Sequence, residues 1–223
     1  LFAPDMLITV SIVLHLFLAG LGAWWLARVL QVSRRGALFS ALVYALGGFM
    51  IAHAGHLSIV STTAWLPWLL TLLHLTAKAT DTRERVVTSL ALGAVTALQF
   101  LAGHAQMTLL MFLPALAWAL YLVLVSPDRL GTLKRLLLPA AGVLLGTILA
   151  APQILTTVQL AGLSQRAGGL DSTFFTSYSF HPFLVATFLS PFLLGNPYPS
   201  GSIELMGYVG LIPLALSWIA LRR

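Results

Sequence analysis

The sequence predicts an all-helical integral membrane protein, a polytopic bundle of about seven transmembrane helices. Of its 223 residues, 59% are hydrophobic and only 8% are charged, and the mean hydropathy is +0.94. Soluble domains carry about a quarter charged residues, so this composition excludes them. The chain has no cysteine, which excludes disulfides and thiolate metal sites. The net charge of +6 comes from small groups of cations between apolar runs, so no nucleic-acid partner is expected.

The expected spans follow from the length of each apolar run, because a membrane-crossing helix needs about 20 residues. On that rule we place seven spans, at roughly 6–30, 37–52, 57–76, 86–101, 106–125, 136–151 and 208–221, the last of which is short. Three prolines fall within or near the ends of these runs and are expected to kink or begin helices: Pro67, Pro114 and Pro139. Gly142, Gly146 and Ala150 repeat at four-residue spacing, which predicts a small-residue face for close helix packing.

The basic residues give an independent prediction of topology, because cytoplasmic loops collect lysine and arginine. Eleven of the twelve fall in alternate connections or after the last run, and only Arg166 falls on the other side. The chain is therefore expected to start outside and end inside as a single transmembrane domain. Its longest connection, residues 152–207, is an expected extracytoplasmic segment too apolar and aromatic for disorder. Residues 153–165 and 182–189 are expected to form short interfacial helices there.

Two short polar breaks between spans, at residues 53–56 and 102–106, are interpreted as the floor of a shared outer site. They carry His53, His56 and His104, and the outer side also holds His181. Polar groups at membrane depth are costly unless paired, so their gathering on one side suggests function. The alternative for each histidine is a hydrogen bond to a neighbouring carbonyl group. A pair of histidines facing each other across a haem is a further open alternative.

Other residue roles are divided between function and structure. Arg166 suits a phosphate, which an arginine grips bidentately, or pairs with Asp171 or Glu204. Those two acids are the weak candidates for a catalytic base. His15 is expected to pack between helices, His74 to lie at the interface, and the tryptophans, Trp65 among them, to form a membrane-interface belt or to pack. No metalloprotease, Walker or nucleophile-elbow motif is present.

Six stretches in order resemble the YfhO-like bacterial membrane proteins. They are residues 15–28, 37–56, 65–67, 101–106 (LAGHAQ), 150–166 (AAPQILTTVQLAGLSQR) and 207–214 (GYVGLIPL). That family is similar in architecture to the GT-C glycosyltransferases, which transfer a sugar from a polyprenyl-phosphate carrier on the outer face of the bacterial cytoplasmic membrane. The resemblance implies a multi-pass enzyme of the cell envelope whose acceptor is an envelope polymer or a lipid.

The resemblance also implies a substrate-binding set at the outer membrane edge. Its candidate members are His53, His56, His104, Gln106, Gln153, Arg166 and His181. Arg166 would hold the donor phosphate, and a carboxylate would deprotonate the acceptor hydroxyl. The chain is expected to be a fragment that lacks the first helix and outer loop, where GT-C enzymes carry their catalytic acid. No cofactor or metal-ligand set is identified, although a divalent metal is an open alternative. The rival function is a transporter or flippase of a lipid-linked or polar substrate.

Overall fold

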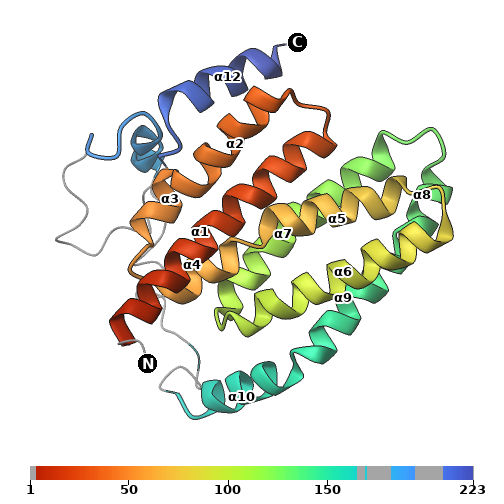
Figure 1. The fold of residues 1–223 in the computed structure, drawn as a ribbon, viewed down its shortest axis with the longest axis horizontal. Helices are drawn as coiled ribbons and strands as arrows, with labels where there is room; N and C mark the ends of the chain where they lie inside the picture. Colours follow the sequence, from red (N-terminus) through yellow and green to blue (C-terminus); the bar gives the residue numbers. More distant parts are fainter. Residues whose placement is uncertain (1–3, 165–168, 170–181, 194–207, 223) are drawn as a thin grey trace.

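The computed structural model describes residues 4–164, 169, 182–193 and 208–222, and their regular elements are all helical (Figure 1). Six segments among them are long and apolar enough to cross a membrane. They are α1 (Pro4–Val29), α2 with α3 (Arg34–Leu46 and Gly48–Ala52), α4 with α5 (Leu57–Thr63 and Leu66–Lys78), α6 (Thr82–Leu101), α7 (Ala105–Leu124), and α8 with α9 (Arg129–Arg135 and Leu137–Leu149). The chain is thus a multi-pass helical membrane protein, and the predicted fold class is confirmed.

The seventh expected span corresponds to a shorter helix, α12 (Leu211–Leu221). Its 11 residues rise about 16 Å, roughly half the thickness of the hydrocarbon core. The backbone just before it packs tightly on the start of α3, where a side chain on Gly48 would overlap the carbonyl group of Tyr208.

The bundle has two chemically different ends (Figure 1). One end, which we call the basic end, holds the α1–α2, α5–α6 and α7–α8 connections. The other, which we call the opposite end, holds the α3–α4, α6–α7 and α9–α10 connections. Every lysine and arginine among the described residues lies in or near the basic end: Arg28, Arg34, Arg35, Lys78, Arg83, Arg85, Arg129, Lys134, Arg135 and Arg222. The basic end is therefore the one expected to face the cytoplasm.

Large apolar side chains cover the outside of the bundle. On α7, for example, Leu109, Leu113, Leu116 and Leu120 are all exposed. A water-soluble protein rarely exposes so large a contiguous apolar surface. Lipid tails are the solvent that this surface fits, and a bilayer is accordingly the environment of these helices.

Three spans are broken, and a proline or glycine stands at or near each break. Pro67 lies in the first turn of α5 and has no N–H, so the carbonyl group of Thr63 loses its helical partner. The hydroxyl of Tyr44 donates a hydrogen bond to that carbonyl across 2.8 Å. Pro139 lies in the first turn of α9, and Gly47 separates α2 from α3 in an extended conformation. Pro114 lies inside α7. Each expected proline is thus within a helix or in its first turn.

The most extensive helix–helix contact in the described part of the bundle joins α6 to α9, and the two backbones approach closely there. A methyl group on Gly146 would overlap the carbonyl oxygen of Gly93, and one on Gly142 would overlap that of Ser89. Gly142, Gly146 and Ala150 are buried at this contact, which confirms the predicted small-residue face. Such a face lets two backbones approach closely, and packing of this kind holds helices together in lipid.

A second interhelical link joins α5 to α1. The indole N–H of Trp68 donates to the backbone carbonyl of Leu18 across 2.9 Å, and Gly22 leaves the space that the indole fills. Trp68 also meets Trp25 edge to face, with ring centroids 5.4 Å apart. The tryptophans here pack between helices, in agreement with the packing alternative.

The segment expected to be extracytoplasmic, residues 152–207, is described only in part. Its first residues form α10 (Ala151–Gly162), and a later piece forms the 3-10 helix η1 (Pro182–Phe188). Both short helices match expected ones. Residues 165–168, 170–181 and 194–207 lie outside the described residues, and so do the predicted site residues Arg166, Asp171, His181 and Glu204.

The topology can be tested because the chain has no cysteine of its own. Gly55 at the opposite end and Thr80 at the basic end are both exposed. A membrane-impermeant maleimide should label the Gly55→Cys variant in intact cells and the Thr80→Cys variant only after permeabilisation. Labelling of both from outside would contradict the proposed orientation.

The α6–α9 contact predicts a sharp difference between two glycines. Gly146→Ala should lower the free energy of unfolding by about 1–3 kcal/mol, because the added methyl group forces the two backbones apart. Gly162→Ala is the matched control, since nothing lies within 4 Å of its new methyl group. Thermal unfolding in detergent measures both. Equal midpoints for the two variants would mean that close approach does not stabilise the bundle.

Candidate functional site

The three candidate histidines described in the structure all lie at the opposite end, and two are neighbours. His53 ends α3 and is 3% exposed; its Nδ1 donates to the backbone carbonyl of Phe49 across 2.8 Å. The His53 ring lies on the Phe49 ring, with centroids 4.3 Å apart. His56 precedes α4, is exposed, and has its ring centroid 6.2 Å from that of His53. His53 therefore makes the hydrogen bond to a neighbouring carbonyl that is the alternative to a binding role, whereas His56 faces outward.

His104 begins α7 as its N-cap residue. Its Nδ1 accepts a hydrogen bond from the backbone N–H of Met107 across 3.2 Å, and Gly103 before it adopts a positive φ of 83°. Glycine reaches this conformation without the steric cost that other residues meet. Because Nδ1 accepts, a neutral His104 ring carries its proton on Nε2. Gln106 follows in the first turn of α7 and is exposed.

Gln153 lies elsewhere, on α10. Its side-chain amide donates to the hydroxyl of Thr157 across 3.4 Å within the same helix. Helix α10 contacts α6 and α9. The structure thus brings His53 beside His56, places His104 and Gln106 on another connection of the same end, and leaves Gln153 on a separate helix. Within the described part of the chain, no group of three or more histidine, aspartate or glutamate residues is placed to hold a metal ion.

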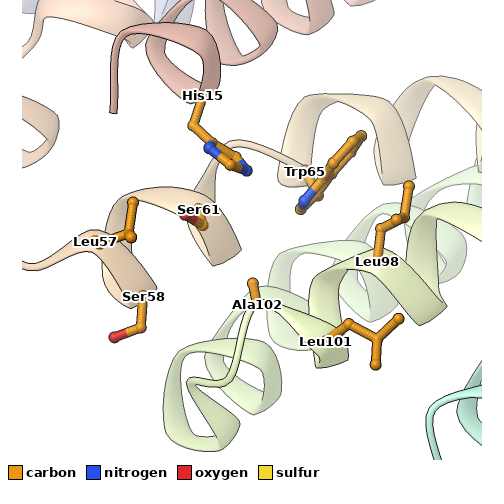
Figure 2. Close-up of a pocket in the computed structure, with 8 residues that line it drawn as sticks. All are labelled: His15, Leu57, Ser58, Ser61, Trp65, Leu98, Leu101 and Ala102. Atoms are coloured by element: carbon orange, nitrogen blue, oxygen red, sulfur yellow. The ribbon is translucent and has the colours of Figure 1, made fainter. Parts of the chain in front are cut away.

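A groove of about 650 Å³ lies between α1, α4 and α6 (Figure 2). The residues that line it are His15, Leu57, Ser58, Ser61, Trp65, Leu98, Leu101 and Ala102. Leu57 begins α4 and Leu101 ends α6, so one edge of the groove lies at the opposite end of the bundle. Trp65 stands at the junction of α4 and α5, so the groove reaches from that edge along the whole of α4.

His15 stands deep in this groove. Its Nδ1 lies 2.7 Å from the backbone oxygen of Ser11, one turn earlier in α1, and 3.4 Å from the Ser11 hydroxyl. Thirteen residues separate His15 from Arg28, so His15 lies about 20 Å along α1 from the basic end. That distance is about two thirds of the hydrocarbon thickness. The ring points into the space bounded by Ser61 and Trp65 (Figure 2).

The sequence pattern does not indicate that His15, Ser58, Ser61 and Trp65 line one groove. His15 lies inside a long apolar run and was expected to pack between helices, and Trp65 was assigned to the interface belt or to packing. Ser58 and Ser61 are three residues apart and so share a helical face next to a candidate histidine. From that spacing, a polar face on this helix could have been predicted. The contribution of α1 could not be found this way, because it depends on tertiary packing.

Behind the groove lies a buried polar layer. Gln99 is 0% exposed; its amide nitrogen donates to the carbonyl of Thr62 across 3.4 Å, which joins α6 to α4. Thr108 of α7 donates to the carbonyl of Gln99 across 3.5 Å. Gln99 and Thr62 each lie within about two turns of the opposite end. These bonds tie α4, α6 and α7 together beside the groove and hold the wall that carries Ser58 and Ser61.

Comparison of the chain with protein-family models, with curated proteins and with solved structures finds no match.

The cap made by His104 predicts different outcomes for two substitutions. His104→Ala should lower the free energy of unfolding by about 0.5–2 kcal/mol, because the N–H of Met107 loses its acceptor. His104→Asn should unfold like the unchanged protein, since asparagine is a favoured N-cap residue. Thermal unfolding in detergent measures both. If both variants lose the same free energy of unfolding, the His104 ring does not stabilise the protein by capping α7.

Proposed function

We propose that the chain is a glycosyltransferase-like membrane protein that takes a sugar from a polyprenyl-phosphate carrier at the outer face of the bacterial cytoplasmic membrane. The observation that carries the proposal is the groove between α1, α4 and α6, largely apolar and with one edge at the end away from the basic connections. The YfhO-like resemblance of the sequence supports the same function.

The walls of the groove match one class of ligand. Leu57, Leu98 and Leu101 offer apolar surface to a hydrocarbon chain, while Ser58 and Ser61 offer hydroxyls to a polar group. Ligand sites commonly combine an apolar lining with a few polar groups that fix orientation. A lipid whose polar head lies at the membrane surface fits both parts, because its tail reaches the groove directly from the bilayer.

The proposed chemistry uses the histidines at the helix ends. In the transfer step, the acceptor oxygen bonds to the anomeric carbon as a general base takes its proton, the bond from that carbon to the phosphate oxygen breaks, and the polyprenyl phosphate leaves with the electron pair. Hydrogen-bond donors placed near that phosphate stabilise the charge that develops on it. His56 and the Nε2–H of His104 are candidate donors at the opposite end, and Arg166 is the candidate cation.

A transporter or flippase is the second candidate, and the broken helices favour it. Discontinuous helices and buried polar groups line the sites of many secondary transporters. Here α2 breaks from α3 and α4 from α5, and buried Gln99 lies beside the second of these spans. Against it, Gln99 and Thr62 lie within about two turns of one end of the bundle, as expected for surface chemistry.

Lipid binding provides the first test of the proposed function. Native mass spectrometry in detergent, with undecaprenyl phosphate and undecaprenol in competition, should retain the phosphate form. Leu101→Trp should reduce that retention, because Leu101 lines the groove. Leu113→Trp is the matched control, since Leu113 is 61% exposed on the outside of α7. If both variants retain undecaprenyl phosphate, or if both fail to retain it, the groove is not the binding site. If the unchanged protein retains neither lipid, the proposal loses its main support.

A second measurement separates the two candidates. Proteoliposomes containing the protein and extracted bacterial lipid-linked sugars are analysed by mass spectrometry and by access of an external glycosidase. A transferase leaves free polyprenyl phosphate behind. A flippase leaves the lipid-linked sugar intact and changes only the leaflet in which the glycosidase reaches it.

A further inference from the structure

We propose that the groove binds the hydroxyl group of a lipid-borne acceptor and that His15 accepts the proton of that hydroxyl during transfer. The proton-transfer step rests on the proposed function, whereas the binding of a hydroxyl does not. Neither Asp171 nor Glu204 is needed as the base in this scheme.

The hydrogen bond of His15 determines what its ring offers to the groove. A backbone carbonyl can only accept a hydrogen bond, so the Nδ1 that lies 2.7 Å from the oxygen of Ser11 carries a proton. In the neutral ring, Nε2 then has a free lone pair and can accept a hydrogen bond or a proton. The ring extends from α1 into the groove, so this nitrogen is presented to a ligand (Figure 2).

Two donors face the same space from other helices. Among the described residues, neither the indole N–H of Trp65 nor the hydroxyl of Ser61 has a hydrogen-bond partner, and both residues line the groove. An alcohol matches this set because its O–H donates to Nε2 while its oxygen accepts from the indole or the serine. A phosphate ester does not match this set, because its oxygens accept only and would meet the lone pair of Nε2. The donor phosphate is accordingly assigned to His56 and His104 at the helix ends, and only its hydrocarbon tail to the leucines of the groove.

The surroundings add no competing charge. The other residues that line the groove carry no titratable group. On the elements packed against α1, the hydroxyl of Tyr44 on α2 is bonded to Thr63 and the ring of His74 on α5 lies against Trp118. His56, the N-cap residue of α4, is exposed and makes no side-chain capping hydrogen bond. The cations Arg34 and Arg35 of α2 and Lys78 of α5 lie at the basic end. Asp5 lies ten residues before His15, about 15 Å along α1. His15 is therefore the one described group in the groove that can exchange a proton.

The resulting step balances in atoms and electrons. The acceptor oxygen bonds to the anomeric carbon of the donor sugar as its proton moves to Nε2 of His15. The bond from that carbon to the phosphate oxygen breaks, and the polyprenyl phosphate leaves with the bonding pair. His15 becomes an imidazolium and later releases its proton to water. A positioned histidine is the commonest group for this kind of general base catalysis.

The test observes His15 directly by nitrogen-15 NMR of the histidine-labelled chain in lipid nanodiscs, with the His15→Asn variant to assign its signals. The probes are farnesol, which has a hydroxyl, and farnesyl methyl ether, which lacks the donor proton. We expect the neutral ring to carry its proton on Nδ1 and the Nε2 signal to shift with farnesol but not with the ether. A proton on Nε2, no shift, or equal shifts with both probes would overturn the hydroxyl site.

Binding by native mass spectrometry adds a readout that a merely structural role would not give. His15→Asn should weaken farnesol retention about fivefold, the equivalent of one lost hydrogen bond, and leave undecaprenyl phosphate retention unchanged. Unchanged farnesol retention in a folded variant would overturn the role of His15. If undecaprenyl phosphate is never retained, the proposed function and the proton-transfer step fall together, even where the farnesol shift is seen.

Discussion

Much of this structure depends on one constraint, that a backbone polar group inside a membrane must find its partner within the protein. In hydrocarbon an unpaired N–H or C=O costs several kcal/mol, so unbroken helices are the default. The span that contains α4 and α5 departs from this default at Pro67, and the hydroxyl of Tyr44 satisfies the carbonyl that the proline leaves free. Gln99 adds a second donor to the same stretch at the Thr62 carbonyl. The break is thus held from two sides, by α2 and by α6.

The held break determines where the groove lies. Trp65 stands at the junction of α4 and α5, where the chain changes from one helix to the next, and its side chain faces the groove together with Ser61. A continuous helix would keep the two residues four apart on one face and would pack them against a neighbour. Here Trp68 bonds to Leu18, and Trp65 packs beside it on the core cluster of Leu69, Leu72, Leu92 and Val95 while also lining the groove with His15. The helix break that Tyr44 and Gln99 stabilise is therefore also the place where Ser61 and Trp65 line the groove.

The sequence was sufficient for the fold class, for six of the seven expected spans and for the charge-defined ends, because these follow from hydrophobic length and from the positions of cations. The seventh expected span is a helix of 11 residues. It was also sufficient for the small-residue face at Gly142 and Gly146, since spacing along one helix defines a face. The sequence located the polar breaks but not the groove. His15 comes from a helix about 50 residues upstream of Trp65, and no local pattern reports that the two side chains meet. For the same reason the pairing of α6 with α9 could not be read from either helix alone.

The glycine contact between α6 and α9 has a consequence for the order of biosynthesis. Gly93 and Gly142 are about 50 residues apart, and at a synthesis rate of about 5–20 residues per second the second follows the first by about 3–10 seconds. During that interval α6 has entered the bilayer with its small-residue face turned to lipid instead of to α9. Helices α1, α2, α4 and α5 are already present and can associate with one another first. Docking of α9 on α6 therefore comes after the helices around the groove have all been synthesised, and α10 and α12 follow it.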